Sequence, residues 1–321
     1  MREIKPEIAD KVFQLEEKFK NSGQDLGSYL DGLLYDKYLT YWDYINLDTL
    51  LSLQKPLTHF PDEEIFIGYH QITELYFKLI IHEQKQILEK EDLTAEFFIQ
   101  KLNRIIRYFR ILTDSFDVMI RGMEREQFLK FRMALLPASG FQSAQFRMIE
   151  LYSTPLKNLV HKEVREEFDN NINLEEVFDN IYWKRGATDL STGEKTLTLK
   201  QFEKRYTPRF LRIANEHREN TIFHRYERLS SEEKNNKNLI EALRNLDVAV
   251  NVNWLLIHIG AAQRYLVNKN NSVAPATGGT NWKEFLPPSF QRISFFPQLW
   301  SEEELKTWGK EWVEETFNNK N

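Results

Sequence analysis

Apolar residues recur three and four positions apart along most of this chain, which predicts helices rather than the alternating pattern of strands. Short amphipathic helices are predicted at 5–20, 25–38 and 41–54. A long helix is predicted from Ile65 to about Leu88, where the apolar periodicity continues without a proline. Acidic residues at 62–64 precede it, as is favourable at a helix N-terminus.

Further helices are predicted at about 93–121, at 124–136 and from Phe141 onward, with a break at Pro137–Gly140. The most apolar helix is predicted from Leu239 to Val267 and contains sixteen consecutive uncharged residues, 248–263. At ~1.5 Å per residue this run is about 24 Å long, too short to span a bilayer and therefore expected at the centre of a bundle. The sequence predicts an all-α fold, a single helical-bundle domain over 1–321.

The segment 161–235 differs from its surroundings. It is rich in charge, and its stretch TDLSTGEKTLTL at 188–199 is typical of a small hairpin or an ordered loop between helical flanks. We interpret 161–235 as an elaboration of the same domain. The C-terminal remainder, with tryptophans at 282, 300, 308 and 312, is predicted to pack as an ordered region.

The composition of the chain excludes several classes of function and partner. Lys plus Arg is 43 and Asp plus Glu is 48, which gives a net charge of −5 and argues against a nucleic-acid partner. The chain has no cysteine, so disulfides, thiolate metal ligands and cysteine nucleophiles are excluded. No apolar run is long enough for a membrane span and the charged start is not a signal peptide, so we expect no membrane partner and a cytoplasmic location.

Two of the seven histidines lie within long apolar helices, His70 and His258. A buried imidazole must satisfy both ring nitrogens, either by hydrogen bonds within the protein or by binding a ligand. Small residues at 260–262 follow His258 and leave room for a flat group beside the helix, although they serve close helix packing equally well. Phe66 and Glu74 lie one turn before and after His70 on the same stripe, which lines a pocket or stabilises the helix.

Arg132 follows Phe128 by one turn in an apolar setting, where a guanidinium needs a carboxylate from the protein or from a ligand. The loop Thr277–Thr280, TGGT, offers backbone amides and hydroxyls but is a weak signal alone. Common metal and nucleotide motifs are absent: no histidine has a Glu three residues before it, and HExxH, GxGxxG and GxxxxGK[ST] are not found.

Taken together, four blocks of sequence resemble the tryptophan 2,3-dioxygenase family. They occur in the family's order and spread over most of the chain: YWDYINLDTLLSLQKPL at 41–57, DEEIFIGYHQITELYFKLIIHE at 62–83, FRMALLPASGFQSAQFRMIE at 131–150, and Trp254, His258 and Arg264 followed by TGGT at 277–280. The elements FIGYHQITEL and SGFQSAQFR are long and individually distinctive.

The resemblance implies a bundle with a central pocket for haem b, one per subunit and ferrous in the active state, in a homotetramer. It implies an oxidoreductase that inserts O2 across the indole C2–C3 bond of L-tryptophan to give N-formylkynurenine, the first step of tryptophan catabolism by the kynurenine route. The absence of cysteine agrees with an imidazole-ligated, non-covalent haem.

The resemblance also implies residue roles. His258 would be the axial ligand of the haem iron, flanked by Trp254 and Arg264. His70 would be the catalytic histidine that accepts a hydrogen bond from the indole N–H. Arg132 would grip the substrate carboxylate with two hydrogen bonds, a task for which lysine is a poor replacement.

The other implied contacts complete the substrate pocket. Phe66 would pack against the indole ring, Thr277 would contact the substrate ammonium and carboxylate, and the N-terminal segment 1–60 would reach into a neighbouring subunit. The full set of implied substrate contacts is Phe66, His70, Phe128, Arg132, Ser139, Gly140 and Thr277, with Tyr41, Tyr44 and Ile45 from the neighbouring subunit.

The chain departs from the family's usual pattern in a few places. Phe128 stands where many members have a tyrosine, Tyr76 replaces a common tryptophan, and 161–235 is extended relative to compact bacterial members. These departures favour one alternative, a related haem-dependent aromatic oxygenase that acts on a modified indole. A non-catalytic haem-binding helical protein is a second alternative, which no feature of the sequence requires.

Overall fold

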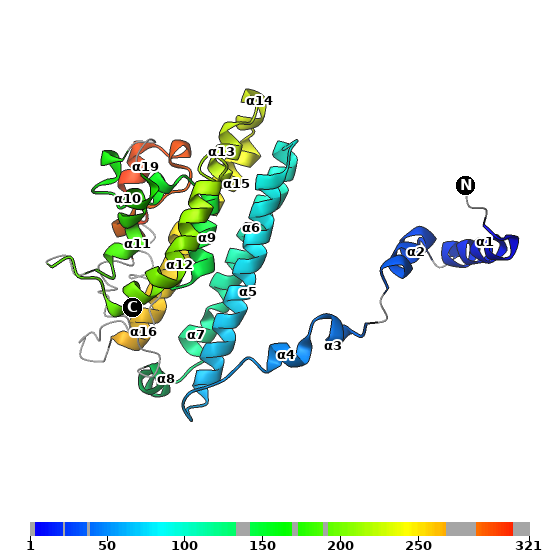
Figure 1. Cartoon of the computed structure of the whole chain (residues 1–321), viewed down its shortest axis with the longest axis horizontal. Helices are drawn as coiled ribbons and strands as arrows, with labels where there is room; N and C mark the ends of the chain where they lie inside the picture. The colour runs from blue at the N-terminus through cyan, green and yellow to red at the C-terminus, as the bar shows by residue number, and fades with distance from the viewer. Residues whose placement is uncertain are drawn as a thin grey trace. The chain divides into compact units, whose positions relative to one another are not determined.

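The computed structural model describes residues 4–21, 23–36, 39–132, 142–168, 173–188, 192–267 and 287–310. Within these ranges the chain forms helices and turns, with two isolated β-bridges and no strand, which confirms the predicted all-α fold. The chain divides into two compact units, Met1–Lys55 and Pro56–Asn321 (Figure 1).

The smaller unit contains four helices: α1 (Pro6–Asn21), α2 (Leu26–Tyr35), α3 (Tyr41–Tyr44) and α4 (Leu47–Leu51). Side chains cap two of them. Asp25 accepts from the backbone N–H of Ser28 at 2.6 Å at the start of α2, and Thr40 caps α3. None of the residues in these four helices is buried, so the described part of this unit has no apolar core of its own.

The larger unit is built around two long neighbouring helices, α5 (Asp62–Glu89) and α6 (Ala95–Ser115) (Figure 1). The prediction of a long helix at about 65–88 is therefore confirmed. Helix α9 (Ala144–Ser153) packs on α5, and α15 (Lys237–Val248) packs on α6. Fully buried side chains such as Phe77, Ile80 and Phe109 fill the space between these helices.

The apolar helix predicted at 239–267 is interrupted by a wider turn. Helix α15 continues into a π-helix, η4 (Ala249–Asn253), and then into α16 (Trp254–Leu266). A π-turn adds a residue to the helix, and because each residue of an α-helix turns it by about 100°, the side chains that follow face another direction. Helix α16 contacts α6 and two short helices, α7 (Asp117–Arg121) and α8 (Arg125–Phe131).

The elaboration at 161–235 is helical and shares its packing with the central helices. Its elements are η3 (Arg165–Glu167), α10 (Leu174–Asp179), α11 (Tyr182–Arg185), α12 (Leu197–Glu216), α13 (Ile222–Glu227) and α14 (Ser231–Lys234), preceded by η2 (Leu156–Leu159). Helix α12 packs on α9 and α10 packs on α12. In the stretch predicted as a hairpin or loop, Thr188 and Lys195 form one antiparallel bridge and α12 begins at Leu197.

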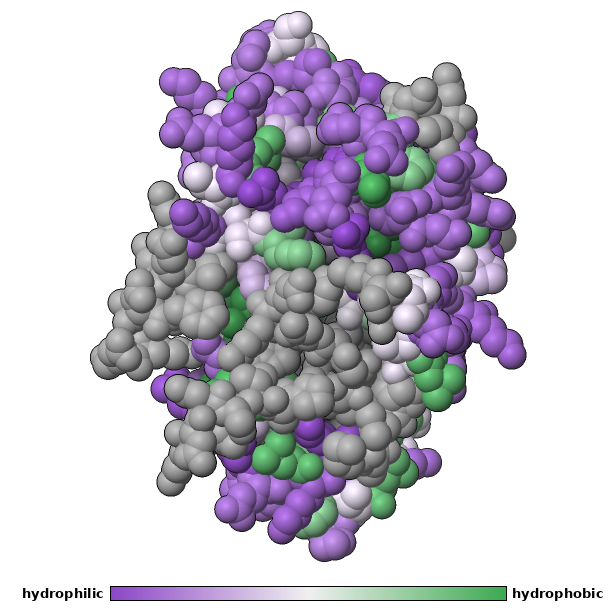
Figure 2. Space-filling view, turned by 90° about the vertical axis from the view of Figure 1, so that its left-hand side faces the viewer, coloured by the Kyte–Doolittle hydropathy of each residue, from purple (hydrophilic) through white to green (hydrophobic). Residues whose placement is uncertain are grey.

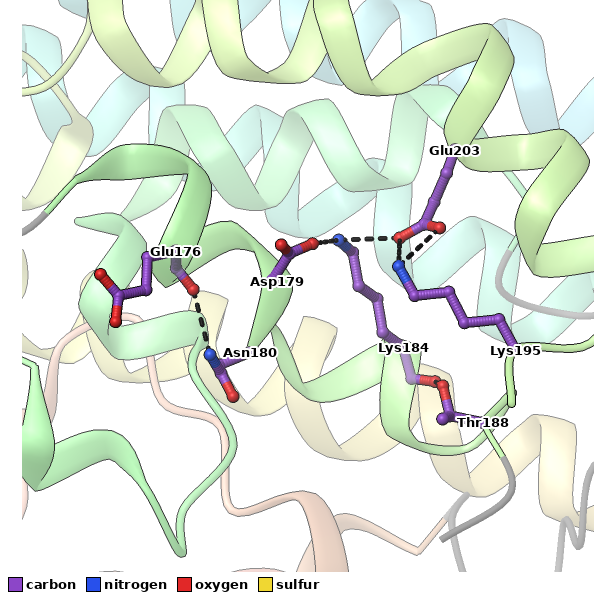
Figure 3. A network of polar contacts seen from close by, with 7 residues as sticks. All are labelled: Glu176, Asp179, Asn180, Lys184, Thr188, Lys195 and Glu203. Carbon is purple, nitrogen blue, oxygen red and sulfur yellow. Dashed lines mark hydrogen bonds and ion pairs between the residues drawn. The ribbon is translucent and has the colours of Figure 1, made fainter. Parts of the chain in front are cut away.

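Ion pairs fix the start of α12 (Figure 3). The ammonium group of buried Lys184 lies 3.1 Å from the carboxylate of Asp179 and 2.9 Å from that of Glu203, and Lys195 is 2.9 Å from Glu203. Glu203 on α12 therefore connects α11 to the bridge residue Lys195. These ion pairs hold the polar stretch before α12 in place, because so short a loop has little apolar surface to bury.

The C-terminal elements α18 (Pro288–Gln291), η5 (Pro297–Leu299) and α19 (Glu302–Lys306) are tied to α15 by one buried carboxylate. Asp247 accepts hydrogen bonds from Ser294 Oγ at 2.6 Å, from Trp300 Nε1 at 3.0 Å and from the backbone N–H groups of Phe295 and Phe296. Burial raises the pKa of Asp247, and these donors oppose the shift. The predicted packing is seen for Trp300 and Trp308, whereas Trp282 and Trp312 lie outside the described residues.

Among the described residues, no helix combines the length and hydropathy needed to cross a bilayer. The face in Figure 2 is mostly hydrophilic where it is coloured, with scattered hydrophobic side chains.

Candidate functional site

His70 on α5 and His258 on α16 share one local arrangement. The Nδ1 atom of His70 lies 2.7 Å from the backbone carbonyl oxygen of Phe66, and Nδ1 of His258 lies 2.7 Å from that of Trp254. A carbonyl oxygen only accepts hydrogen bonds, so Nδ1 of each ring carries the proton. Nε2 then keeps its lone pair on the side of the ring away from its own helix turn, available to a metal or a donor.

Aromatic rings hold both imidazoles in place. The ring of Phe66 lies 4.1 Å from that of His70, and Trp254 lies 4.4 Å from His258, each measured between centroids. Phe116, at the end of α6, contacts His258 at 4.6 Å and Tyr69 at 5.6 Å. Tyr69, which precedes His70 in the chain, and His258 therefore both pack against Phe116.

The electrostatics agree with two neutral rings that lie near each other. Burial lowers the pKa of His258 to about 4, and the nearby His70 imidazole contributes to the shift while the Trp254 carbonyl opposes it. Burial also lowers the pKa of His70, against the carbonyl of Phe66 and the charge of Glu74. Both imidazoles are therefore neutral at pH 7, the form that binds metals and accepts hydrogen bonds.

The two rings differ in their exposure to solvent. His70 is exposed to solvent and His258 partly so, yet surrounding protein atoms lower the pKa of each.

The donor set fits a metal held by a macrocycle better than a bare ion. Among the described residues, no group of three or more His, Asp or Glu side chains is placed to hold a metal ion. A bare structural or catalytic ion usually needs three or four protein ligands. A haem iron needs one or two, and His258 supplies a neutral, oriented nitrogen for that role.

A second aromatic group adjoins His70 and carries the predicted substrate residues. Phe66 lies 6.2 Å from Phe128 and 5.7 Å from Phe131, and Phe128 lies 4.5 Å from Tyr265. The structure thus brings Phe66, His70 and Phe128 together.

Arg132 follows Phe131 directly at the end of α8 and is 8% exposed. Burial lowers the pKa of its guanidinium, and an arginine side chain in a protein keeps its charge. A buried cation at the edge of an aromatic group is suited to binding an amino-acid carboxylate.

The remaining predicted site residues include Arg264, whose side chain is exposed near the end of α16, with its guanidinium 6.0 Å from the centre of the neighbouring Tyr265 ring. Tyr41, Tyr44 and Ile45 belong to the smaller unit, where both tyrosines are exposed. Ser139, Gly140 and Thr277 lie outside the described residues.

Three aromatic residues of the site were not predicted. Phe116 and Phe131 lie at helix ends, and Tyr265 donates its hydroxyl proton to the Met119 carbonyl at 2.6 Å. Tyr265 lies seven residues after His258, two helical turns along the same face, so the spacing could have identified it. The π-helix before α16 has no comparable sequence signal.

Fold and site define a class: an all-α protein in which two helices carry neutral histidines packed among aromatic rings, with one histidine suited to ligate a haem iron. The family model described as tryptophan 2,3-dioxygenase matches residues 33–204, more than half of the chain. The chain belongs to the tryptophan 2,3-dioxygenase family. The matched range contains His70, Phe128 and Arg132 and ends before α16.

Three relatives with the name tryptophan 2,3-dioxygenase illustrate the similarity. A protein of Bacillus thuringiensis subsp. konkukian is 36% identical over 137 residues, 41% of this chain and 48% of the relative. One of Ruegeria sp. is 42% identical over 114 residues, 35% of this chain and 40% of the relative. In these matches the chain spans about half or less of the relative's length. One of Geobacillus thermodenitrificans is 27% identical over 277 residues, 83% of this chain and 92% of the relative.

Proposed function

We propose that this chain is a haem-dependent dioxygenase that converts L-tryptophan and O2 to N-formylkynurenine, the first step of tryptophan catabolism by the kynurenine route. The observation that carries the proposal is the pair of neutral histidines, each with Nδ1 held by its own helix and with no hydrogen bond to Nε2 from the described part of the chain. Family membership supports the reaction. When bound, haem b, one per subunit, would supply the ferrous iron that binds and activates O2.

His258 would hold the haem iron through Nε2. Its hydrogen bond to the Trp254 carbonyl fixes the tautomer and the ring orientation, as is usual for histidine ligands. The depressed pKa keeps the ring free of a second proton in the physiological range. Trp254 and Arg264 are proposed to flank the haem, Trp254 through its packing against His258.

His70 would accept the indole N–H at Nε2, and Phe66 and Phe128 would pack against the indole ring. Arg132 would bind the substrate carboxylate, with Thr277 at the ammonium and Ser139 and Gly140 along the pocket wall. These contacts fix the indole in one orientation and exclude water. Such positioning accounts for much of an enzyme's rate and requires no strong general base here.

We also propose a homotetramer in which Tyr41, Tyr44 and Ile45 of segment 1–60 complete a neighbour's pocket. The absence of buried residues in the helices at 6–51 supports this, because their apolar side chains need a surface to cover. Mixing Tyr44→Ala chains with Arg132→Ala chains is expected to restore activity, since some mixed sites carry both wild-type residues. No recovery in verified hetero-oligomers would contradict the exchange. The cytoplasmic location stays a prediction.

Product mass tests the reaction. The reduced, haem-supplied protein is given L-tryptophan and O2, and a product about 32 mass units heavier than tryptophan is expected, because both oxygen atoms are added. Phe128 in place of the family's usual tyrosine favours a second candidate, an oxygenase acting on a modified indole. A gain of about 16 units, or turnover only with substituted indoles, would establish that candidate. Haem binding without turnover of any indole would leave a non-catalytic haem protein.

A further inference from the structure

Four cationic side chains gather at a place remote in sequence from the histidine pair. Lys162 and Arg165 follow η2, Arg185 ends α11, and Arg292 follows α18. We call these four residues, together with His161, the basic cluster. The carboxylate of Glu163 is 2.5 Å from Arg185 and 4.0 Å from His161 Nδ1, and Glu166 attracts Arg165. Within the described ranges, the carboxylates that attract cations of this cluster are those of Glu163 and Glu166.

Mutual repulsion shows that these groups are close together. Burial lowers the pKa of Lys162, and the charges of Arg292 and Arg185 lower it further, against the attraction of Glu163. The guanidinium of Arg165 donates to the backbone carbonyl of Arg292 at 3.2 Å, which links the two segments. Because the fold holds these positive charges close together, an anion bound among them would be attracted by all of them.

Phe290 gives the cluster a common wall. The ammonium group of Lys162 lies 5.0 Å from the centre of its ring, and the imidazole of His161 lies 5.7 Å from it. An apolar wall lowers the local dielectric, which strengthens the attraction between the cations and an anion. Arg292 has a left-handed backbone conformation with φ of 48°, which is unusual for a residue other than glycine.

Two buried donors of the cluster have no hydrogen-bond partner among the residues that the structure describes. His161 is 2% exposed, and its Nδ1 accepts from the Glu163 backbone N–H at 3.4 Å and lies 3.2 Å from Nη1 of Arg185, a donor. Nε2 of His161 therefore carries the proton, and it is buried without an acceptor. Nε of Arg185 is buried without an acceptor as well. Buried donors normally have partners, so their presence here points to a ligand that accepts hydrogen bonds.

We propose that the basic cluster binds a phosphate-class oxyanion. Lys162, Arg185 and Arg292 supply the positive charge, and the unpartnered N–H groups supply further donors. An oxyanion with several acceptor oxygens satisfies cations and donors together, as a single carboxylate does not. This site is independent of the proposed dioxygenase reaction and of its haem.

Titration calorimetry with inorganic phosphate tests the site on the full-length chain at low ionic strength, with sodium chloride of matched ionic strength as the blank. We expect saturable binding of one phosphate per chain. Lys162→Gln and Arg292→Gln should each weaken it about tenfold, because each removes a charged contact. Lys200→Gln, which removes one charge from an exposed position on α12, should leave binding within about twofold.

Circular dichroism must first show that each variant keeps its helical content, and Arg292→Lys serves as a second variant that keeps the charge. Equal weakening by Lys200→Gln would reveal general charge screening and overturn the proposal, as would an absence of saturable heat beyond the chloride blank. Phenyl phosphate, titrated in parallel, separates the two sources of the anion. Tighter binding of the monoester would assign the site to an organic phosphate, and tighter binding of phosphate would assign it to the free ion.

Discussion

The helix around His70 and the helix around His258 place the same motif in different surroundings. In both, Nδ1 is bound to the carbonyl four residues back and an aromatic ring from that residue packs on the imidazole. Around His258 a second ring, Phe116, closes in and the pKa falls to about 4. Around His70 the charge of Glu74 opposes the fall and solvent reaches the ring. The surroundings, rather than the motif, distinguish the ring suited to a metal from the ring suited to a substrate.

The two histidines also differ in the helix that leads to them. Helix α5 is described without interruption from Asp62 to Glu89, whereas α16 is reached through the π-helix at 249–253. The added residue lets Asp247 face the C-terminal elements while His258 faces the aromatic site. The π-helix therefore sets the different directions of the Asp247 and His258 side chains.

Haem retention should show the largest difference between the two helices. His258→Ala removes the proposed iron ligand, so we expect the haem affinity to fall at least a hundredfold, measured by the Soret band during haem titration. His82→Ala, on the exposed side of α5, is the matched control and should bind haem normally. Normal haem affinity in His258→Ala would end the assignment of the ligand.

Arg132 sharpens the comparison on the substrate side. Arg132→Ala should keep haem and raise the KM for tryptophan about 10- to 100-fold, because a charged hydrogen bond is worth roughly 1.5–3 kcal/mol. Arg132→Lys should recover only part of this loss, since lysine cannot form the bidentate contact. Loss of haem from Arg132→Ala would mean that the arginine has a structural role instead.

His70→Ala should be milder again. It removes one substrate hydrogen bond, typically worth about 1–3 kcal/mol, and we expect a roughly tenfold weaker affinity for tryptophan with haem retained. His70→Gln, which keeps an acceptor, should recover part of the affinity. The comparison would break down if His70→Ala lost haem as His258→Ala does.

His161, which lies outside the pair, shows how a lowered histidine pKa affects stability. Burial and the charge of Arg185 lower the pKa of His161 to about 4, from an ordinary value of 6.5. Between these values the unfolded chain binds a proton that the folded chain does not, so this contribution is full above pH 6.5 and is lost as the pH falls through 4. His161→Gln should flatten the slope of unfolding free energy against pH by up to about 1.4 kcal/mol per unit in this window. Denaturant unfolding at pH 4.5–6.5, without phosphate, measures it, and an unchanged slope would show that His161 titrates normally.

Local sequence patterns predicted the parts of the molecule that depend on neighbouring residues. The apolar periodicity from Ile65 to about Leu88 predicted α5, and one-turn spacing placed Phe66 beside His70, whereas the pairing of Trp254 with His258 came from the family resemblance. Contacts between distant segments could not be predicted in this way. Phe116 reaches His258 from another helix, and the basic cluster joins residues 161–165, 185 and 292. Such groups form only when the tertiary fold brings separate elements together.

The division of roles between the two neutral histidines is tested by the coordination state of the ferrous haem-loaded protein, because we assign one of them, His258, to the metal and the other, His70, to the substrate. Magnetic circular dichroism of the reduced, oxygen-free protein distinguishes one imidazole ligand from two. The account predicts a five-coordinate, high-spin iron bound by one histidine, unchanged in His70→Ala. A six-coordinate, low-spin iron that becomes five-coordinate in His70→Ala would show that both histidines bind the metal, and would contradict the division of roles between α5 and α16.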